Sequence, residues 1–246
     1  MLSSILTPVQ AFNTTVEDDI HKEKNVAIAD PATYLKENVA EMMMPGEPWY
    51  RIACHGHSVP GGHTVDPLME IDTAYPMIWR QKLIRRFPFR GINVIVTAVG
   101  GESSPSGAER FERDVLALNP SIITIDYGVN DRVCGLEKAE VAWRQMIEQS
   151  LEHQIKVLLL TPTFDVRPEK EGTMDDHVRQ IRDLANEYEV GLVDSYQAFT
   201  NHVEGGGYAG ELMSVAHHPN DLGHEIISRE LMRWIPVFDV LAAKNE

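Results

Sequence analysis

Short apolar runs alternate along the chain with longer stretches in which apolar residues recur every three or four positions. The short runs are rich in valine, isoleucine and leucine and are bounded by turn-forming residues, which is typical of buried strands. They predict strands over residues 50–54, 93–98, 121–127, 156–160 and 190–194. The periodic stretches predict helices over residues 74–87, 105–118, 136–153, 175–188 and 221–234.

This fivefold alternation of strands and helices indicates parallel strands joined by crossover helices that cover both faces of the sheet. We therefore expect an α/β fold, a three-layer α/β/α sandwich around a five-stranded parallel sheet, over residues 47–246. Residues 1–46 predict a helical extension that packs on this domain, with Asp30 as its cap and Pro31 at the first helical position. Apolar residues recur there at helical spacing: Tyr34, Leu35, Val39, Met42 and Met43. The extension is also the natural place for a contact in a homo-oligomer.

The charge balance narrows the range of partners. The chain has 246 residues, 22 basic and 37 acidic, for a formal net charge of −15. This disfavours nucleic acids and anionic membranes as partners and leaves a small neutral or cationic molecule as the expected substrate. The first residues lack the pattern of a secretory signal, and no apolar run approaches the roughly 18 residues of a membrane helix, so a cytoplasmic protein is expected. The two cysteines, Cys54 and Cys134, are expected to be buried small hydrophobic residues rather than a disulfide framework.

Polar, glycine-rich turns follow three of the predicted strands. Residues 56–62 (GHSVPGG) follow the first strand, residues 100–103 (GGES) the second and residues 128–131 (GVND) the third. Because the carboxyl ends of parallel strands lie at one edge of a sheet, we expect these turns to lie together. A fourth polar segment, residues 217–220 (HHPN), precedes the last helix. A hydroxyl, two hydrogen-bond donors and an imidazole are the groups that nucleophilic acyl transfer needs.

In chain order these four segments resemble the four sequence blocks of the SGNH hydrolases, the GDSL-type esterases and lipases, which supply Ser, Gly, Asn and His. The resemblance spans residues 56–224. It implies a flavodoxin-like strand order and no cofactor. It also implies that Ser58 is the nucleophile and His218 its base. The oxyanion hole would consist of the backbone N–H groups of Ser58 and Gly101 and the side-chain amide of Asn130, while Asp131 braces its loop.

Two positions depart from the family pattern. His57 stands where an acidic residue usually precedes the serine, and Val215 stands three residues before His218, where an aspartate usually orients the histidine. The group that orients His218 is therefore open: it is either a backbone carbonyl or a carboxylate from elsewhere in the chain. The carboxylate candidates are Glu211, Asp194 and Asp221.

The expected function is that of a serine esterase acting on a small-molecule ester, with short acyl or acetyl groups favoured because no long apolar lid segment is evident. Residues 163–172 and 205–208 are candidates for the rim of the pocket, with plain surface loops as the alternative. One alternative is a metal-dependent hydrolase, because histidines crowd the same segments: His55, His57, His63, His217, His218 and His224. The other is a binding protein on a hydrolase scaffold, because the usual orienting aspartate is missing.

Overall fold

The computed structural model describes residues 27–65, 67–165 and 173–237. Its centre is a sheet of five parallel strands in the order β2-β1-β3-β4-β5. The strands are β1 (Gly46–Gly56), β2 (Arg90–Val96), β3 (Ile122–Asp126), β4 (Lys156–Leu160) and β5 (Gly191–Val193). This is the flavodoxin-like order expected from the family resemblance, in which ligands bind beyond the carboxyl ends of the strands.

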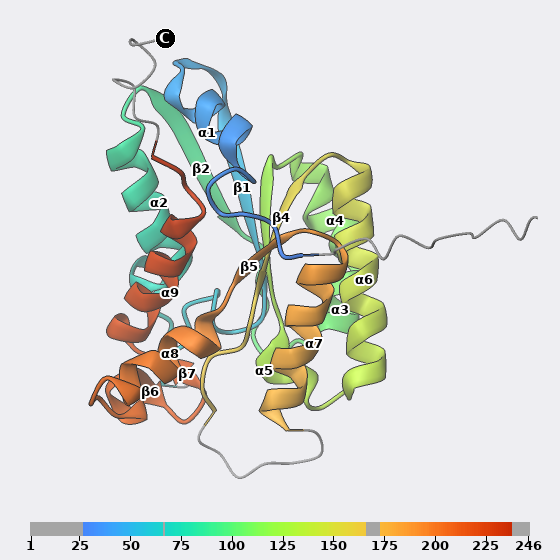
Figure 1. Ribbon diagram of the computed structural model, residues 1–246, viewed down its shortest axis with the longest axis vertical. Coiled ribbons are helices and arrows are strands. Elements are labelled where there is room, and N and C mark those ends of the chain that lie inside the picture. Colours follow the sequence, from blue (N-terminus) through green and yellow to red (C-terminus); the bar gives the residue numbers. More distant parts are fainter. Residues whose placement is uncertain (1–26, 66, 166–172, 238–246) are drawn as a thin grey trace, which may run out of the picture.

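Helices cover both faces of the sheet (Figure 1). One face carries α1 (Lys36–Met43), α2 (Tyr75–Arg86), α8 (Ser195–Glu204) and α9 (Asp221–Arg233). The other carries α3 (Ser104–Glu109), α4 (Phe111–Asp114), α6 (Leu136–Glu152) and α7 (Met174–Glu187). The expected three-layer α/β/α sandwich is therefore confirmed.

Side chains that alternate along each strand fill two separate cores. On β1, Ile52 and Cys54 pack with the residues of α2 and α9, whereas Ala53 packs with those of α4 and α6. On β4, Leu158 belongs to the first core and Leu159 to the second. All five side chains are fully buried, which explains why these strands are apolar on both faces. Both cysteines are free, Cys54 fully buried as expected and Cys134 only partly buried.

Several elements differ from the pattern-based prediction. Residues 105–118 do not form one helix: α3 ends at Glu109, Arg110 leaves helical geometry at φ −105° and ψ 2°, and α4 follows. Helix α8 was not predicted; it begins after Asp194, whose side chain accepts the backbone N–H of Gln197 as an N-cap. Short elements complete the described chain: α5 (Gly128–Asp131), β6 (Met213–Val215), β7 (His218–Pro219) and 3-10 helices at Ile71–Thr73, Leu116–Leu118 and Ala209–Glu211.

The described part of the N-terminal segment is joined to the main core. Asp30 accepts the backbone N–H of Ala32, but a run of turns precedes α1, which starts only at Lys36. Leu35, Val39 and Met42 are buried in the same core as α2 and α9. Residues 1–26 lie outside the described residues, so a contact between protein copies through this segment stays a prediction.

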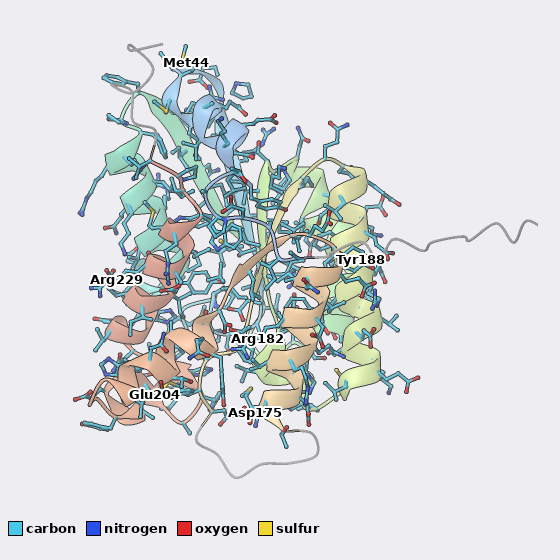
Figure 2. All side chains as sticks on the ribbon, viewed as in Figure 1. Met44, Asp175, Arg182, Tyr188, Glu204 and Arg229 are labelled. Atoms are coloured by element: carbon cyan, nitrogen blue, oxygen red, sulfur yellow. The ribbon has the colours of Figure 1, made fainter. Side chains whose placement is uncertain are left out.

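The short elements that follow the strands lie at one end of the molecule, opposite the end at which α1 lies (Figure 1). Met44, just after α1, lies at one end, and Asp175 and Glu204 lie towards the other (Figure 2). The short helix α5, which follows β3, lies at that second end together with β6 and β7 (Figure 1). None of the helices in the described part of the chain is long and apolar enough to span a lipid bilayer.

Candidate active site

Ser58 and His218 meet at the carboxyl edge of the sheet. Ser58 lies in the turn after β1, and its Oγ is 2.9 Å from Nε2 of His218, which is 160 positions away in the sequence. The other ring nitrogen of His218, Nδ1, lies 2.7 Å from the backbone carbonyl oxygen of Thr64. Ser58 is 7% exposed and His218 is 3% exposed. Three groups from two distant segments thus form one hydrogen-bonded line.

The Thr64 carbonyl determines which ring nitrogen of His218 carries the proton. A carbonyl oxygen only accepts hydrogen bonds, so Nδ1 must be the N–H and Nε2 keeps its lone pair in the neutral ring. Nε2 therefore accepts the hydroxyl hydrogen of Ser58. This is the tautomer that a general base needs in order to activate a serine.

The Nδ1 contact supports the backbone-carbonyl alternative for orienting His218. Of the carboxylates considered from sequence, Glu211 binds His202 Nε2 at 2.9 Å and accepts the backbone N–H of Tyr208 at 3.2 Å. Asp194 is bound by Arg182 from α7 at 2.8 Å and caps α8. Asp221 is the first residue of α9. Glu211 and Asp194 therefore bind other groups: Glu211 stabilises the turn at Tyr208, and Asp194 stabilises the start of α8.

The two backbone N–H groups expected in the oxyanion hole are those of Ser58 and Gly101. Within the described residues, neither the N–H of Ser58 nor that of Gly101 donates to another backbone carbonyl. Gly101 has φ +82°, the left-handed region that favours glycine, although its missing Cβ would meet nothing within 4 Å. A side chain at this position would therefore be disfavoured by backbone strain rather than by a clash. This conformation sets the direction of the 100–102 turn.

Asn130 is held against the same turn. Its side-chain amide donates a hydrogen bond of 2.8 Å to the backbone carbonyl of Glu102, and the second hydrogen of that amide remains for another acceptor. The Glu102 carboxylate is bound in turn by Arg110 at 2.6, 2.9 and 3.1 Å, with both side chains mostly buried. The break between α3 and α4 is thus the place from which Arg110 anchors the turn next to Gly101.

Asp131 braces the loop, as expected from sequence. Its carboxylate is fully buried and accepts the backbone N–H of Ser104 and the indole N–H of Trp143, both at 2.7 Å. Burial raises the pKa of this carboxyl, and the bond from Ser104 opposes the shift. Asp131 therefore ties α5 to α3 and α6.

Two of the histidines that crowd these segments, His55 and His224, bind separate partners in the described residues. His55 makes contacts with Thr97 Oγ1 at 2.9 Å, the Gly107 carbonyl at 3.2 Å and Tyr127 Oη at 3.0 Å. His224 Nδ1 accepts the backbone N–H of Tyr75. No three His, Cys, Asp or Glu side chains in the described ranges are grouped so as to hold a metal ion.

His63 was considered from sequence only as part of that cluster, yet it lies next to the site. Its ring is 5.9 Å from the ring of His218, and Gly100 packs directly against it, so that a Cβ there would come within 2.8 Å of His63. Of the two segments expected at the pocket rim, residues 166–172 lie outside the described residues. Tyr208, in the other segment, is largely exposed. The role of both segments stays a prediction.

Two of the buried histidines make stability depend on pH. Burial lowers the pKa of both His55 and His224 to about 4, whereas an unfolded histidine titrates near 6.5. The unfolded chain therefore binds these protons first, so stability is complete above about pH 6.5 and falls as the pH drops towards 4. Each histidine is expected to cost on the order of 3 kcal/mol over that interval.

Urea unfolding at pH 7.0 and pH 4.5 measures this loss. His224→Asn keeps an acceptor for the Tyr75 N–H but does not titrate, so it should lose less stability than the wild type between the two pH values. An equal loss in both proteins would contradict the assignment for His224.

The site and the fold together define a class of protein, and comparison with known sequences gives the same class. Residues 54–226, more than half of the chain, match the GDSL-like lipase/acylhydrolase family. The chain belongs to this family and is an ester hydrolase. It is similar to an acetylxylan esterase from Geobacillus stearothermophilus, with 27% identity over 164 residues; the match covers 61% of this chain and 74% of that enzyme.

Solved structures show the same architecture. The crystal structure of Axe2, an acetylxylan esterase from Geobacillus stearothermophilus, has a TM-score of 0.67 at 23% identity and covers 80% of this chain and 97% of its own. LAE5, an α/β hydrolase enzyme from the metagenome of Lake Arreo, Spain, has a TM-score of 0.64 at 21% identity and covers 79% and 97%. At these identities the likeness shows the fold.

Proposed function

We propose that this protein is a serine esterase that removes short acyl groups, acetyl above all, from hydroxyl groups of a carbohydrate. The observation that carries the proposal is the hydrogen-bonded line from the Thr64 carbonyl through His218 to the Ser58 hydroxyl. It lies at the sheet edge where α/β folds of this kind bind ligands.

In the proposed reaction, Ser58 Oγ attacks the acyl carbon while His218 Nε2 takes the hydroxyl proton. The charge that develops on the carbonyl oxygen is stabilised by the N–H groups of Ser58 and Gly101 and by the free amide hydrogen of Asn130. His218 then donates its proton to the departing alcohol, which leaves an acyl-enzyme on Ser58. Water, deprotonated by the same nitrogen, hydrolyses this acyl-enzyme.

The neutral Thr64 carbonyl has a consequence for the base. A carboxylate at Nδ1 would stabilise the imidazolium by charge, whereas a carbonyl offers only its dipole and a hydrogen bond. The carbonyl still maintains the tautomer and the ring orientation. Because these are the two conditions under which Nε2 can accept the Ser58 proton, we expect a working enzyme.

Two observations support a short acyl group. Ser58 is only 7% exposed, and its chain neighbours His57 and Val59 are 0% and 1% exposed, which leaves little space beside the nucleophile. The similar enzymes are acetylxylan esterases by name, which supports an acetylated sugar as the substrate class. The net charge of −15 suits a neutral substrate of this kind.

An acyl-chain series tests this specificity. We expect kcat/KM on p-nitrophenyl esters to be highest for acetate and to fall about tenfold or more by butyrate, because added methylenes meet buried side chains. Acetate release from acetylated xylooligosaccharides should be measured alongside. A value of kcat/KM that rises with chain length would contradict the short-acyl proposal. Rapid hydrolysis of aryl acetates with no acetate release from sugar acetates would contradict the proposal that the substrate is a carbohydrate.

A further inference from the structure

His57 stands directly before Ser58 and is fully buried. Its Nδ1 accepts the backbone N–H of Val59 at 3.2 Å and lies 3.3 Å from Ser58 Oγ. The imidazole therefore contacts both the hydroxyl of Ser58 and the backbone of the residue that follows it. The site described above, in which His218 is the base, leaves this second imidazole without a role.

These contacts settle the tautomer of His57. Because Nδ1 accepts the N–H of Val59, it has no hydrogen of its own, so the neutral ring must carry its proton on Nε2. The opposite tautomer would place two N–H groups against each other at Val59. It would also point an N–H at Ser58 Oγ, where it would draw electron density from the attacking oxygen.

Asp126, the last residue of β3, faces the protonated nitrogen. Its Oδ1 is 3.4 Å from His57 Nε2, longer than a normal hydrogen bond but close enough for a buried carboxylate to favour the N–H there. The backbone N–H of His57 also donates to the Asp126 carbonyl at 3.1 Å. On its other side, Asp126 Oδ2 accepts the hydroxyl of Tyr75 from α2 at 3.3 Å. Asp126 is 3% exposed, so water screens this arrangement little.

We propose that His57 is a positioning residue for Ser58 and that Asp126 acts through it by holding the tautomer in which Nδ1 accepts. In this chain the neutral Nδ1 of His57 thus lies beside the nucleophile, and the negatively charged Asp126 lies on the far side of the His57 ring, at the end of β3. The pair keeps the turn at residues 57–59 in the shape that directs the Ser58 hydroxyl at His218. The inference rests on the proposed role of Ser58 as the nucleophile.

Two substitutions of His57 separate positioning from simple burial. The Oδ1 of an asparagine occupies the place of the imidazole Nδ1, whereas a glutamine carries its polar atoms near the place of Nε2. His57→Asn should therefore keep kcat within about threefold of wild type. His57→Gln, closer to histidine in volume, should lose about tenfold or more in kcat with KM changed less than about twofold, because it lacks the acceptor for Val59.

Asp126 is tested by its dependence on His57. Asp126→Asn in the wild-type background should lower kcat about tenfold or more, since an amide donates to Nε2 as readily as it accepts and so admits the wrong tautomer. In the His57→Asn background the same change should alter kcat less than about twofold, because the ring through which Asp126 acts is gone.

The measurements are kcat and KM on p-nitrophenyl acetate, the rate of Ser58 labelling by a fluorophosphonate, and the melting temperature of each variant. A wild type that is not labelled refutes the role of Ser58 itself. With wild-type labelling intact, the inference about His57 is overturned by equal losses in the Asn and Gln variants. It is equally overturned by an undiminished effect of Asp126→Asn in the His57→Asn background. If His57→Gln fails to fold, the two Asp126→Asn measurements decide alone.

Discussion

Replacing Ser58 with alanine is expected to lower kcat on a small activated ester by about 10⁴-fold or more and to abolish covalent labelling by a fluorophosphonate. The reason is that the acyl group has no other acceptor: the hydroxyl 2.9 Å from His218 Nε2 is the nucleophile of the proposed reaction. His218→Ala should cause a loss of similar size. The double variant should be no worse than either single one, because the two groups act as a unit.

The control for this prediction is stability. Ser58→Ala removes only the contacts of one hydroxyl, with His218 and His57, so the free energy of unfolding should change by only about 1 kcal/mol. Undiminished activity in Ser58→Ala would refute the serine mechanism, and loss of that activity with a chelator would then indicate a metal-dependent hydrolase. A wild type that neither turns over an ester nor reacts with the fluorophosphonate would favour a binding protein on this scaffold.

The second large effect is expected at Asn130. Asn130→Ala should lower kcat about 100-fold or more with a smaller change in KM, because one oxyanion donor is typically worth about 3 kcal/mol and acts mainly in the transition state. Asn130→Asp should be worse, since it keeps the shape of the side chain but directs a negatively charged oxygen at the developing negative charge.

The Asn130 amide also holds the Glu102 carbonyl, and this second contact needs its own control. Arg110→Ala loosens the same turn through the Glu102 carboxylate without removing an oxyanion donor. If Arg110→Ala lowered kcat as much as Asn130→Ala, the loss would come from the position of the turn. A loss confined to KM in Asn130→Ala would likewise contradict its role in the transition state. Steady-state kinetics on p-nitrophenyl acetate distinguish these results.

The pattern of the chain predicted the regular core well. Strand β4 occupies the predicted residues 156–160, and α6 ends within one residue of its prediction, because burial on both faces or on one helix face leaves a clear periodic signal. The missed elements are those whose bounds depend on specific side-chain contacts rather than on hydrophobic periodicity. Residues 105–118 have helical periodicity, yet the chain breaks at Arg110, where the guanidinium binds Glu102 and Asp114. Helix α8 follows a strand of only three residues, and its start depends on the Asp194 cap.

Some residues of the candidate site could likewise be predicted from the sequence, and others could not. Ser58, Gly101 and Asn130 were predictable because each follows a strand, and parallel strands bring their carboxyl ends to one edge whatever the loops do. Asp126 had one visible signal, the one charged side chain in segment 122–127, but nothing in the sequence related it to His57. The partner of His218 Nδ1 could not be predicted from the sequence, because it is the backbone carbonyl of Thr64 and every residue has such a carbonyl.

The sequence by itself thus determined the class of the protein: alternating apolar runs specify a parallel α/β sandwich, and four polar segments in order specify an acyl-transfer site. It also located the weak point of that site at Val215. Only the tertiary structure showed that the backbone carbonyl of Thr64 lies at His218 Nδ1. Thr64 and His218 are 154 positions apart, and their 2.7 Å contact forms only when the turn after β1 folds against the segment before α9. What a backbone carbonyl does depends on where the fold directs it, whereas a nucleophilic role for Ser58 could be proposed from its side chain and its position after a strand.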